Sequence, residues 1–523
     1  MEPAVRTSTD ADDVVTVLLD VPGKPVNVCT PQLLAELSAV VDSLAASKPK
    51  AVIIASAKAR SFNAGADLFT IRDMDVQQSA AYLATGQALF ERIRGLPMPT
   101  VAAINGDCLG GGMELALACR YRVAADDGSI TLGLPEVKLG LIPAWGGASH
   151  LPRMIGLAPA LRILLAGATM PPREAHKRGL VDEVVRPEEL RPTARRLVLS
   201  GRQAIRPRRW GRAAGGLAPI QNRILAAARR QFIEPTYENY PAPPRLLEVV
   251  EAGHERGVAA GLVAEREAIL QLMQTGATRN LLRLFFLRQA AKRRAAGRPS
   301  SIPAADPFGP LADRLAVPYC SEALAAVGEG ASVPWVDDAM RRWGMLTGPF
   351  EWMDEKGLDV VNRLLDSQGR PSDALRQAVT NGWLGRKSGK GFYLHGGTER
   401  GGAQVPPVHS ELASLIAPRG GSQSPSRPVA RDELQWRLIL AMVNEAARAL
   451  SEGAVDSADD IDLATVLGLG FAPFRGGLAR FVEDSGAEQL VRRLEEHADR
   501  LGPRFTPAEL LCRMARDRRP FPR

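Results

Sequence analysis

The sequence predicts an α/β domain at the N-terminal end of the chain, followed by helical domains. Three observations lead to this prediction. Short β-branched runs alternate with helical patterns over residues 1–190, helical patterns continue from residue 191, and one pattern occurs twice near the C-terminal end. Strands that alternate with helices indicate an α/β architecture, and 523 residues suffice for several domains, each with its own core.

The first elements are expected at β-branched segments. Val14–Leu19 and Ala51–Ala55 are short apolar runs typical of buried strands, and Pro31–Ala46 between them has helical spacing. Thr100–Ile104 is a third strand, which leads directly into Asn105-Gly106 and a glycine-rich turn. These elements define the α/β domain that we predict for residues 1–190.

Residues 191–300 are predicted to form a helical linker. Helical apolar spacing occurs in three segments, which are Arg223–Phe232, Leu246–Leu270 and Asn280–Lys292. The proline-rich segment Tyr237–Pro244 separates the first two, because proline interrupts helices. Residues Gly297–Pro303 are expected to form a flexible joint.

An internal repeat marks the C-terminal part. Val336–Gly344 is followed by Gly348-Pro349 and by Met353–Gly357, and a similar series begins again at Ile461. We therefore predict two related helical domains, at residues 301–400 and 431–523. Residues 401–430 are rich in Gly, Pro and Ser and are predicted to be a flexible linker between them.

The composition is that of a soluble protein, with 45% hydrophobic and 24% charged residues. We find no apolar stretch of about 18 residues or more that would form a membrane span, and the N-terminus lacks the apolar centre of a signal peptide. The five cysteines form no C-x-x-C pair and no disulfide framework. A reducing, cytoplasmic location is therefore expected.

The net charge of +8 permits two interpretations. The simpler one is an arginine-rich chain with solvated faces, and the other is attraction of a polyanionic ligand such as coenzyme A. Nucleic acid is not expected as a partner, because basic runs such as Arg206–Arg209 and Lys292–Arg294 have no interleaved aromatic residues for stacking.

Two glutamates beside glycine-rich turns are the candidate site. Gly110-Gly111-Gly112 precedes a helical segment that carries Glu114, so that backbone N–H groups lie at a positive helix end. A second small turn, which contains Ala66, can supply another N–H group. Two N–H donors aimed at one oxygen form an oxyanion hole, and Glu114 and Glu136 are suited to proton transfer.

The apolar neighbours of Glu114 predict that it is buried. Leu115 and Leu117 surround it, and a buried carboxylate needs a partner or a function. Asp67 is expected to bond local backbone N–H groups and to be structural. The six histidines show no ligand spacing, so no metal is expected.

These segments together resemble the crotonase family of enoyl-CoA hydratases and isomerases. The motifs are Ala-Gly-Ala-Asp at residues 64–67, Gly-Gly-Gly-Met-Glu at 110–114, Leu-Pro-Glu at 134–136 and Ile-Pro-Ala-Trp-Gly-Gly at 142–147. The resemblance extends from about Val14 to Val185. It implies the ββα spiral fold of that family for the N-terminal domain.

The rest of the chain resembles other parts of the multifunctional fatty-acid β-oxidation enzymes. The helical segment after residue 190 is similar to their linker, and the repeated helical domains resemble the C-terminal domains of 3-hydroxyacyl-CoA dehydrogenase. The resemblance implies fatty-acid β-oxidation as the pathway, with docking of a thiolase subunit and a homodimer as expected assemblies.

The crotonase resemblance implies a role for each site residue. The thioester carbonyl of a 2-enoyl-CoA is expected between the N–H groups of Ala66 and Gly111. Glu114 and Glu136 are expected to hold the water that adds to C3, with Glu136 delivering a proton to C2 and Glu114 helping to deprotonate the water. The same pair can move a proton between C2 and C4, which implies Δ3-Δ2 enoyl-CoA isomerisation as a side activity.

Substrate-binding residues are assigned through the same resemblance. The backbone around Lys24, Val26 and Ala64 is similar to the coenzyme A-binding turn of the family. The remaining residues of the predicted substrate site are Ala66, Asp67, Leu68, Gly110 and Trp145, with Phe69 and Ile71 as further walls of the acyl pocket.

The nicotinamide-binding domain of the multifunctional enzymes has no counterpart in the sequence. About fifteen residues separate the linker helices from Phe308, and they contain no G-x-G-x-x-G motif. Asp313 stands where the dehydrogenase family has an asparagine. We therefore expect no NAD cofactor and no dehydrogenase activity, either because the domain was lost in evolution or because of an internal deletion in this gene.

Two alternatives to a hydratase remain open from the sequence. One is a non-catalytic scaffold or CoA-ester-binding subunit of a β-oxidation complex, against which the intact glutamate pair argues. The other is a crotonase-type isomerase in another acyl-CoA pathway.

Overall fold

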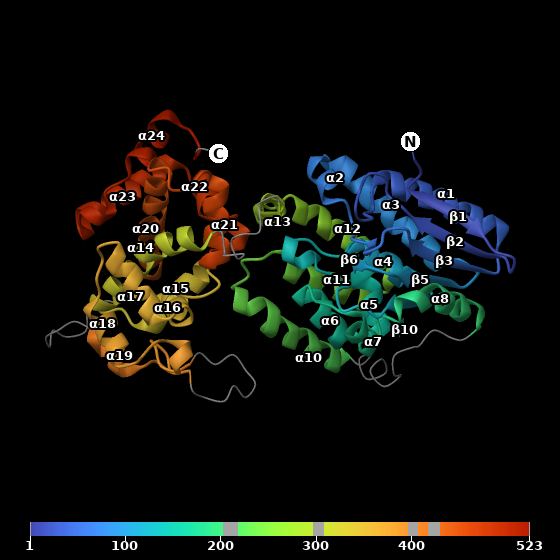
Figure 1. Ribbon diagram of the computed structural model, residues 1–523, viewed down its shortest axis with the longest axis horizontal. Helices are drawn as coiled ribbons and strands as arrows, with labels where there is room; N and C mark the ends of the chain where they lie inside the picture. Colours follow the sequence, from blue (N-terminus) through green and yellow to red (C-terminus); the bar gives the residue numbers. More distant parts are fainter. Residues whose placement is uncertain (1, 202–217, 297–307, 396–405, 417–428, 522–523) are drawn as a thin grey trace. The chain divides into compact units, whose positions relative to one another are not determined.

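The computed structural model describes residues 2–201, 218–296, 308–395, 406–416 and 429–521. The chain divides into two compact units, Met1–Arg279 and Asn280–Arg523. Figure 1 shows strands only in the first of these units, within the residues drawn as ribbon. The predicted joint at Gly297–Pro303 and the basic run Arg206–Arg209 lie outside the described residues.

The N-terminal unit contains two mixed sheets. The large sheet has the strand order β1 (Val5–Thr9), β2 (Val14–Leu19), β3 (Ala51–Ser56), β5 (Thr100–Ile104), β7 (Tyr121–Ala125) and β10 (Glu183–Val185). Its strands are parallel except for the antiparallel pair of β1 and β2. β3 and β5 are buried along their whole length, as the β-branched runs predict. The three strands predicted from the sequence are confirmed.

The small sheet has the order β4 (Ser61–Asn63), β6 (Asp107–Leu109), β8 (Leu132–Gly133) and β9 (Thr169–Met170). β4, β6 and β8 are parallel, and β9 is antiparallel to β8. The chain alternates between the two sheets, since β3, β5 and β7 of the large sheet are each followed by one of these three strands and then by helix. This alternation is the repeating ββα order that the sequence predicts.

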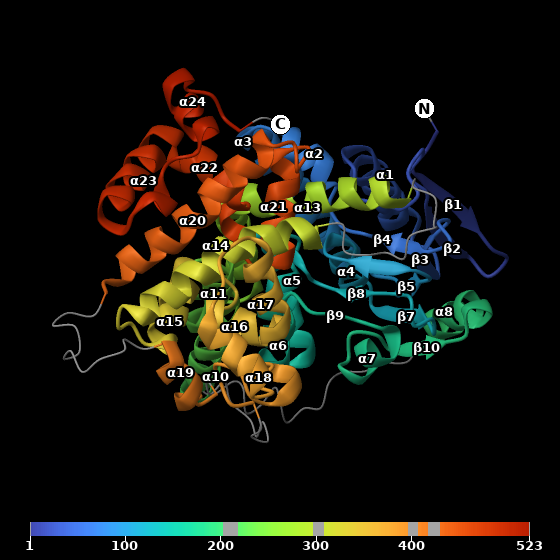
Figure 2. The same ribbon diagram turned by 60° about the vertical axis from the view of Figure 1, so that its left-hand side comes forward.

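Helices surround the two sheets of this unit. They are α1 (Pro31–Ser47), α2 (Leu68–Asp73), α3 (Val76–Arg94), α4 (Gly111–Ala118), α5 (Gly147–Ile155), α6 (Leu157–Ala166), α7 (Pro172–Lys177), α8 (Leu190–Leu199), α10 (Ala218–Ala228), α11 (Ala242–Arg256) and α12 (Val258–Met273), with the short turns η1 (Glu136–Leu139), η2 (Pro187–Glu189), η3 (Arg229–Ile233) and η4 (Glu234–Thr236). α8 contacts β3, β5 and β7, and it lies beside these strands in Figure 2.

The helical spacing predicted at Leu246–Leu270 corresponds to two helices, α11 and α12. Gly257 separates α11 from α12 with a φ of 93°, a conformation that residues with a Cβ rarely adopt. The two helices contact each other, and both contact α5. The structure therefore groups residues 191–279 with the α/β core in one compact unit, and the finer five-part division remains a prediction.

Among the described residues of the C-terminal unit, the regular elements are helices, apart from isolated β-bridges. Two groups of five helices follow the same order. The first group is α14 (Gly309–Gly328), α15 (Val333–Trp343), α16 (Pro349–Lys356), α17 (Leu358–Ser367) and α18 (Asp373–Thr380). The second is α20 (Arg431–Ser451), α21 (Ala458–Gly468), α22 (Leu478–Ser485), α23 (Ala487–Leu501) and α24 (Glu509–Asp517).

The remaining elements are α13, α19 and three short turns. α13 (Gly276–Ala296) crosses the boundary between the units, and η5 (Arg386–Ser388), η6 (Pro473–Arg475) and η7 (Pro503–Phe505) connect helices. α19 (Ser410–Ile416) lies inside the predicted flexible linker at residues 401–430, and its Leu412 is buried in the core of the unit. This part of the segment is therefore packed.

A buried aspartate occupies the same place in both helical groups. Asp337 on α15 accepts the N–H of Phe350 at 2.9 Å, and Asp462 on α21 accepts the N–H of Arg480 at 3.0 Å. Both side chains are fully buried. Each therefore ties its helix to the first turn of the next helix in its group, α16 or α22.

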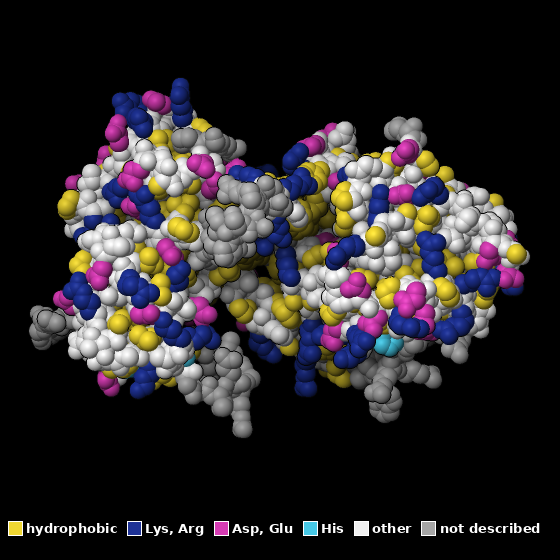
Figure 3. Space-filling model, viewed as in Figure 1, with side chains coloured by type: hydrophobic (Ala, Val, Ile, Leu, Met, Phe, Trp, Pro, Cys, Tyr) yellow, Lys and Arg dark blue, Asp and Glu magenta, His cyan; other side chains and the backbone are white. Residues whose placement is uncertain are grey.

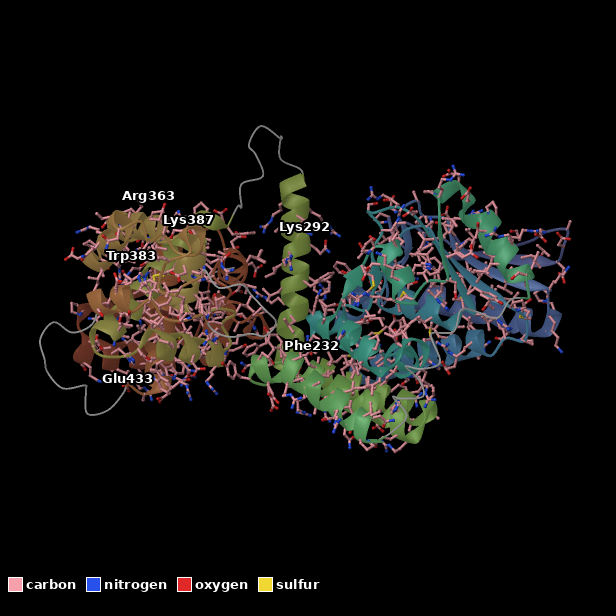
Figure 4. All side chains as sticks on the ribbon, turned by 90° about the horizontal axis from the view of Figure 1, so that it is seen from below. Phe232, Lys292, Arg363, Trp383, Lys387 and Glu433 are labelled. Carbon is pink, nitrogen blue, oxygen red and sulfur yellow. The ribbon has the colours of Figure 1, made fainter. Side chains whose placement is uncertain are left out.

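The segment that closes the first helical group is held by an ion-pair cluster. Asp359 on α17 contacts Lys387 of η5 and, at 3.6 Å, Arg363. Figure 4 labels Arg363 and Lys387 near each other on the C-terminal unit. These exposed pairs stabilise the loop only slightly, since solvent screens them.

The surface carries mixed charge on the face seen in Figure 3. Dark-blue Lys and Arg side chains alternate with magenta Asp and Glu side chains on each unit. This pattern agrees with the simpler interpretation of the net charge of +8. Among the described residues, no helix has both the length and the apolar character needed to cross a membrane.

Candidate active site

The candidate site lies where three parallel strands end. β4, β6 and β8 are neighbours in the small sheet, so their carboxyl ends lie at one edge. Ala66 follows β4, Gly111 follows β6 and Glu136 follows β8, each within three residues of the strand end. Ligand sites commonly lie at the carboxyl ends of parallel strands. The topology thus brings together residues that are far apart in the sequence.

The two predicted oxyanion donors lie close to each other. A Cβ on Gly65 would lie 3.1 Å from the nitrogen of Gly111, and a Cβ on Gly111 would lie 3.5 Å from the nitrogen of Ala66. Gly111 is the first residue of α4, where N–H groups have no partner within the helix. Among the described residues, no acceptor is recorded for either N–H group. Both remain available to a ligand oxygen.

Glycine is needed on both sides of this pair. Gly65 has a φ of 92° and Gly110 a φ of 53°, and a Cβ on Gly110 would lie 2.8 Å from Glu136 Oε1. Asn63 stabilises the first turn, since its Oδ1 accepts the N–H of Gly65 at 2.8 Å. The backbone is therefore shaped before any ligand arrives.

Glu114 is buried, as the sequence predicts, and is held through one oxygen. Its Oε1 accepts the N–H groups of Trp145 and Gly147, each at 2.8 Å. Burial raises the pKa of Glu114 to about 7, although these two hydrogen bonds act in the opposite direction. Its second oxygen has no recorded hydrogen bond within the described residues. Glu114 is thus held in place through Oε1.

Glu136 has a buried carboxyl group whose Oε2 lacks a hydrogen-bond partner among the described residues. Burial raises the pKa of Glu136 well above its ordinary value, and the nearby charges of Glu114 and Glu265 raise it further. These surroundings therefore favour the protonated form of this carboxyl group.

Trp145 lies directly beside the oxyanion turn. A Cβ on Gly111 would lie 2.4 Å from Trp145 Cζ3, and a Cβ on Gly86 of α3 would lie 2.5 Å from Trp145 Cε2. The indole also contacts Tyr82 and Phe90 edge-on, at centroid distances of 5.5 and 5.3 Å. Trp145 is therefore packed between α3 and α4, next to one of the expected donors.

The residues predicted for coenzyme A binding lie on the rim of this site. Lys24 Nζ contacts Asp67 Oδ2 at 2.6 Å, and Ala64 N–H donates to the carbonyl of Asn27 at 2.8 Å. The Lys24 and Thr70 hydrogen bonds lower the pKa of Asp67 although its burial acts against them. Asp67 thus holds Lys24 in place, which fits its predicted structural role.

The apolar residues of this rim are partly open to solvent. Phe69 is 44% exposed and Val26 is 37% exposed, whereas Ile71 is buried. Leu68 begins α2, which Phe69 and Ile71 also belong to. An exposed aromatic side chain on a short helix beside the site is a candidate contact for a bound acyl chain or adenine ring.

A third buried glutamate was not predicted. Glu265 on α12 is fully buried, and its two oxygens accept the N–H groups of Gly146 and Ser149 at 2.8 and 2.7 Å. Burial and the charge of Glu114 raise the pKa of Glu265 to about 8. The sequence does contain a signal, because Glu265 lies on the apolar stripe of α12 with Gly261, Ala268, Ile269 and Leu272.

Comparison with known families agrees with this geometry. Residues 10–205 match the enoyl-CoA hydratase/isomerase family, and residues 309–395 match the C-terminal domain of 3-hydroxyacyl-CoA dehydrogenase. The chain therefore combines a crotonase domain with a dehydrogenase C-terminal domain. This is an architecture like that of the multifunctional β-oxidation enzymes, without a match to their nicotinamide-binding domain.

Solved structures of the crotonase family are similar to part of the chain. An enoyl-CoA hydratase from Bacillus anthracis has 28% identity, with 55% of this chain and 96% of that chain covered and a TM-score of 0.36. The human mitochondrial Δ3-Δ2-enoyl-CoA isomerase has 25% identity, with 55% and 99% covered and a TM-score of 0.42.

Asp313 is engaged in an ion pair. Its Oδ1 lies 2.6 Å from Lys356 Nζ, so that α14 and α16 are linked by this contact. The Asp313 carboxylate is thus paired with a lysine within the same helical group.

Proposed function

We propose that this protein hydrates 2-enoyl-CoA thioesters to 3-hydroxyacyl-CoA. One observation carries the proposal. A buried Glu114 and a Glu136 whose buried Oε2 has no recorded partner among the described residues lie beside two N–H groups for which no acceptor is recorded, where adjacent parallel strands end. A thioester carbonyl between Ala66 and Gly111 would gain about 3 kcal/mol of transition-state stabilisation from each donor as negative charge develops on its oxygen.

The protonation states suggest how the two glutamates divide the work. Burial raises the pKa of both glutamates, and the charge of Glu114 raises that of Glu136 further, which supports Glu114 as the base and Glu136 as the acid. As the water oxygen bonds to C3, one water proton passes to Glu114 and the C2=C3 π electrons move toward the thioester. C2 then takes the proton of Glu136. Proton exchange through the pair or through solvent restores the starting state.

Hydration assays with crotonyl-CoA and 2-decenoyl-CoA test the proposal directly. Loss of the enoyl-thioester absorbance should follow saturation kinetics, and the product should have the mass of the substrate plus one water. A folded protein that hydrates neither substrate but binds acyl-CoA would favour the alternative of a non-catalytic scaffold.

A second activity, Δ3-Δ2 enoyl-CoA isomerisation, is favoured by the unpartnered Oε2 of Glu136. In its ionised form, Glu136 can take a proton from C2 and return it to C4 while the enolate rests in the oxyanion hole. An assay of the purified protein for conversion of a 3-enoyl-CoA to its 2-enoyl isomer tests this activity. Fast isomerisation together with slow hydration would make the isomerase the main function.

We also propose that the chain lacks 3-hydroxyacyl-CoA dehydrogenase activity. The described part of residues 206–308 forms α10 to α13 and short turns, whereas a nicotinamide-binding domain needs parallel strands. Asp313, with its lysine partner, occupies the place of the family's asparagine. Calorimetric titration with NAD should show no binding up to millimolar concentration, and NADH formation from 3-hydroxybutyryl-CoA would contradict the proposal.

The helical repeat supports a second domain of the dehydrogenase type after the matched residues 309–395. α15 and α21 have 11 residues each, α16 and α22 have 8 each, and a buried aspartate takes the same place in both groups. These likenesses support a second dehydrogenase-like domain at residues 431–523. A homodimer, a thiolase partner and a cytoplasmic role in β-oxidation complete the proposal, and mass measurement in solution and co-purification with thiolase test the assemblies.

A further inference from the structure

Glu265 is a buried acid outside the glutamate pair that performs the proposed chemistry. It comes from α12, and both of its oxygens are used by backbone N–H groups of the turn that begins α5. A fully buried carboxylate is costly unless something compensates it. Its place in this turn needs an explanation beyond packing.

The turn from Trp145 to Ser149 is shared between two glutamates. Glu114 accepts the N–H groups of Trp145 and Gly147, whereas Glu265 accepts those of Gly146 and Ser149. The two acids thus alternate along the same stretch of backbone. Any displacement of this turn by loss of Glu265 must also move the donors that hold Glu114.

Two nearby polar side chains are engaged with other groups. Arg266, which follows Glu265 in the sequence, donates to Gln87 Oε1 at 2.8 Å, and His150 Nε2 lies 2.7 Å from Glu91 Oε1. Within the described part of the chain, the recorded hydrogen-bond partners of Glu265 are Gly146 and Ser149 of the turn, and no charged side chain is recorded with a hydrogen bond or ion pair to it. Its contacts therefore serve the geometry of the turn.

Close packing on both sides restricts how the Trp145–Ser149 turn can adjust to the loss of Glu265. A Cβ on Gly147 would lie 2.9 Å from Glu114 Oε1, and a Cβ on Gly261 of α12 would lie 2.5 Å from Ser149 Oγ. α12 therefore approaches α5 closely on one side of the turn, while Glu114 contacts it on the other. Two close contacts of this kind transmit small shifts.

We propose that Glu265 is a positioning residue for Glu114. It holds the Trp145–Ser149 turn so that Glu114 Oε1 stays fixed and its other oxygen faces the reacting water. The inference rests on the proposed hydration, since it assigns Glu265 a role in that reaction. It also explains why a helix outside the predicted α/β domain belongs to the same compact unit as the site.

Kinetics of Glu265→Gln test the proposal, because its amide cannot accept from both N–H groups. We expect kcat for crotonyl-CoA to fall about 10-fold or more while KM changes less than about 2-fold. Glu265→Asp, which keeps the carboxylate, should recover part of kcat. Glu267→Gln, at an exposed position of the same helix, is the matched control and should behave as wild type.

A double-mutant cycle separates positioning from general stability. If Glu265 acts through Glu114, the effect of Glu265→Gln should nearly vanish in a Glu114→Gln background. The same fold-loss in both backgrounds, or an unchanged kcat in folded Glu265→Gln, would overturn the proposal. If the glutamine variant does not fold, Glu265→Asp replaces it in the double-mutant cycle, with the same expected outcomes.

Amide hydrogen exchange provides a readout that does not need activity. Peptides that cover residues 145–149 should exchange faster in Glu265→Gln than in wild type, and those that cover β3 should not change. Unchanged exchange at residues 145–149 would contradict the proposed contact. Wild-type protein that hydrates no enoyl-CoA would instead refute the proposed function, whatever the exchange shows.

Discussion

Both units contain buried carboxyl groups, but they use them differently. In the C-terminal unit, Asp337 Oδ1 accepts the N–H of Phe350 and its Oδ2 accepts the hydroxyl of Tyr393 at 2.6 Å. In the N-terminal unit, Glu114 is held through one oxygen, and Glu136 has a buried oxygen without a recorded partner among the described residues. Burial raises the pKa of each of these groups.

This difference teaches that burial alone does not mark a reactive acid. Burial costs each carboxyl group its solvation, but hydrogen bonds at both oxygens convert Asp337 into a structural link. An oxygen that is left free retains its capacity to take or give a proton. The number of occupied oxygens, rather than the pKa shift, separates Asp337 from Glu114 and Glu136.

The largest expected effect comes from filling the space beside the oxyanion turn. Gly111→Val should abolish hydration, because its Cβ would overlap the ring of Trp145 and displace the donor N–H. Gly348→Val is the matched control, since a Cβ there would lie 2.2 Å from Asp337 Oδ1. It should lower the melting temperature and leave kcat nearly unchanged. Full activity in Gly111→Val would place the oxyanion site elsewhere.

Removal of each acid in turn should give the next largest effect. Glu114→Gln and Glu136→Gln should each lower kcat about 100-fold or more with a smaller change in KM, since each is needed for proton transfer. Asp337→Asn and Asp462→Asn should alter thermal stability and leave kcat within about 2-fold. Steady-state kinetics check the two glutamine variants, and calorimetry together with kinetics checks the two asparagine variants. Near-wild-type turnover in either glutamine variant would contradict the assignment of these glutamates as catalytic.

The pH dependence of hydration should show which glutamate is the base. Because Glu114 has a pKa of about 7 and must be ionised, kcat/KM should rise with pH through about 7. It should fall again at higher pH, when Glu136 loses the proton that it gives to C2. Profiles measured with crotonyl-CoA from pH 5 to 10 check this, and a flat acid limb would contradict the role of Glu114.

The smallest effect on hydration is expected from a change in the C-terminal unit, where the readout is the pH dependence of stability. Burial raises the pKa of Asp337 from 3.8 to about 8, so the folded state binds the proton more tightly than the unfolded state. The contribution of the protonated Asp337 to the free energy of unfolding is full below about pH 4. It is lost as the pH rises toward 8, by at most about 1.4 kcal/mol per pH unit. Asp337→Asn should flatten this slope in denaturant titrations, and an unchanged slope would contradict it.

Local sequence determined much of the fold and part of the site. β-branched runs such as Ala51–Ala55 form strands because their side chains suit a sheet that is buried on both faces. The glycines at 65 and 110 mark turns with positive φ, which side chains other than glycine rarely adopt. Glu114 was predicted to be buried because leucines flank it on a short apolar helix.

Tertiary structure alone decided how these pieces act together. No local pattern indicates that Glu265 bonds to Gly146, 119 positions away in the sequence. The helical spacing at Leu246–Leu270 also does not show that Gly257 separates two helices there, the second of which contacts α5. Nor does any local pattern show that Trp145 fills the space beside Gly111. Sequence periodicity identifies the buried face of a helix, but the partner of a buried polar group depends on which elements the fold brings together.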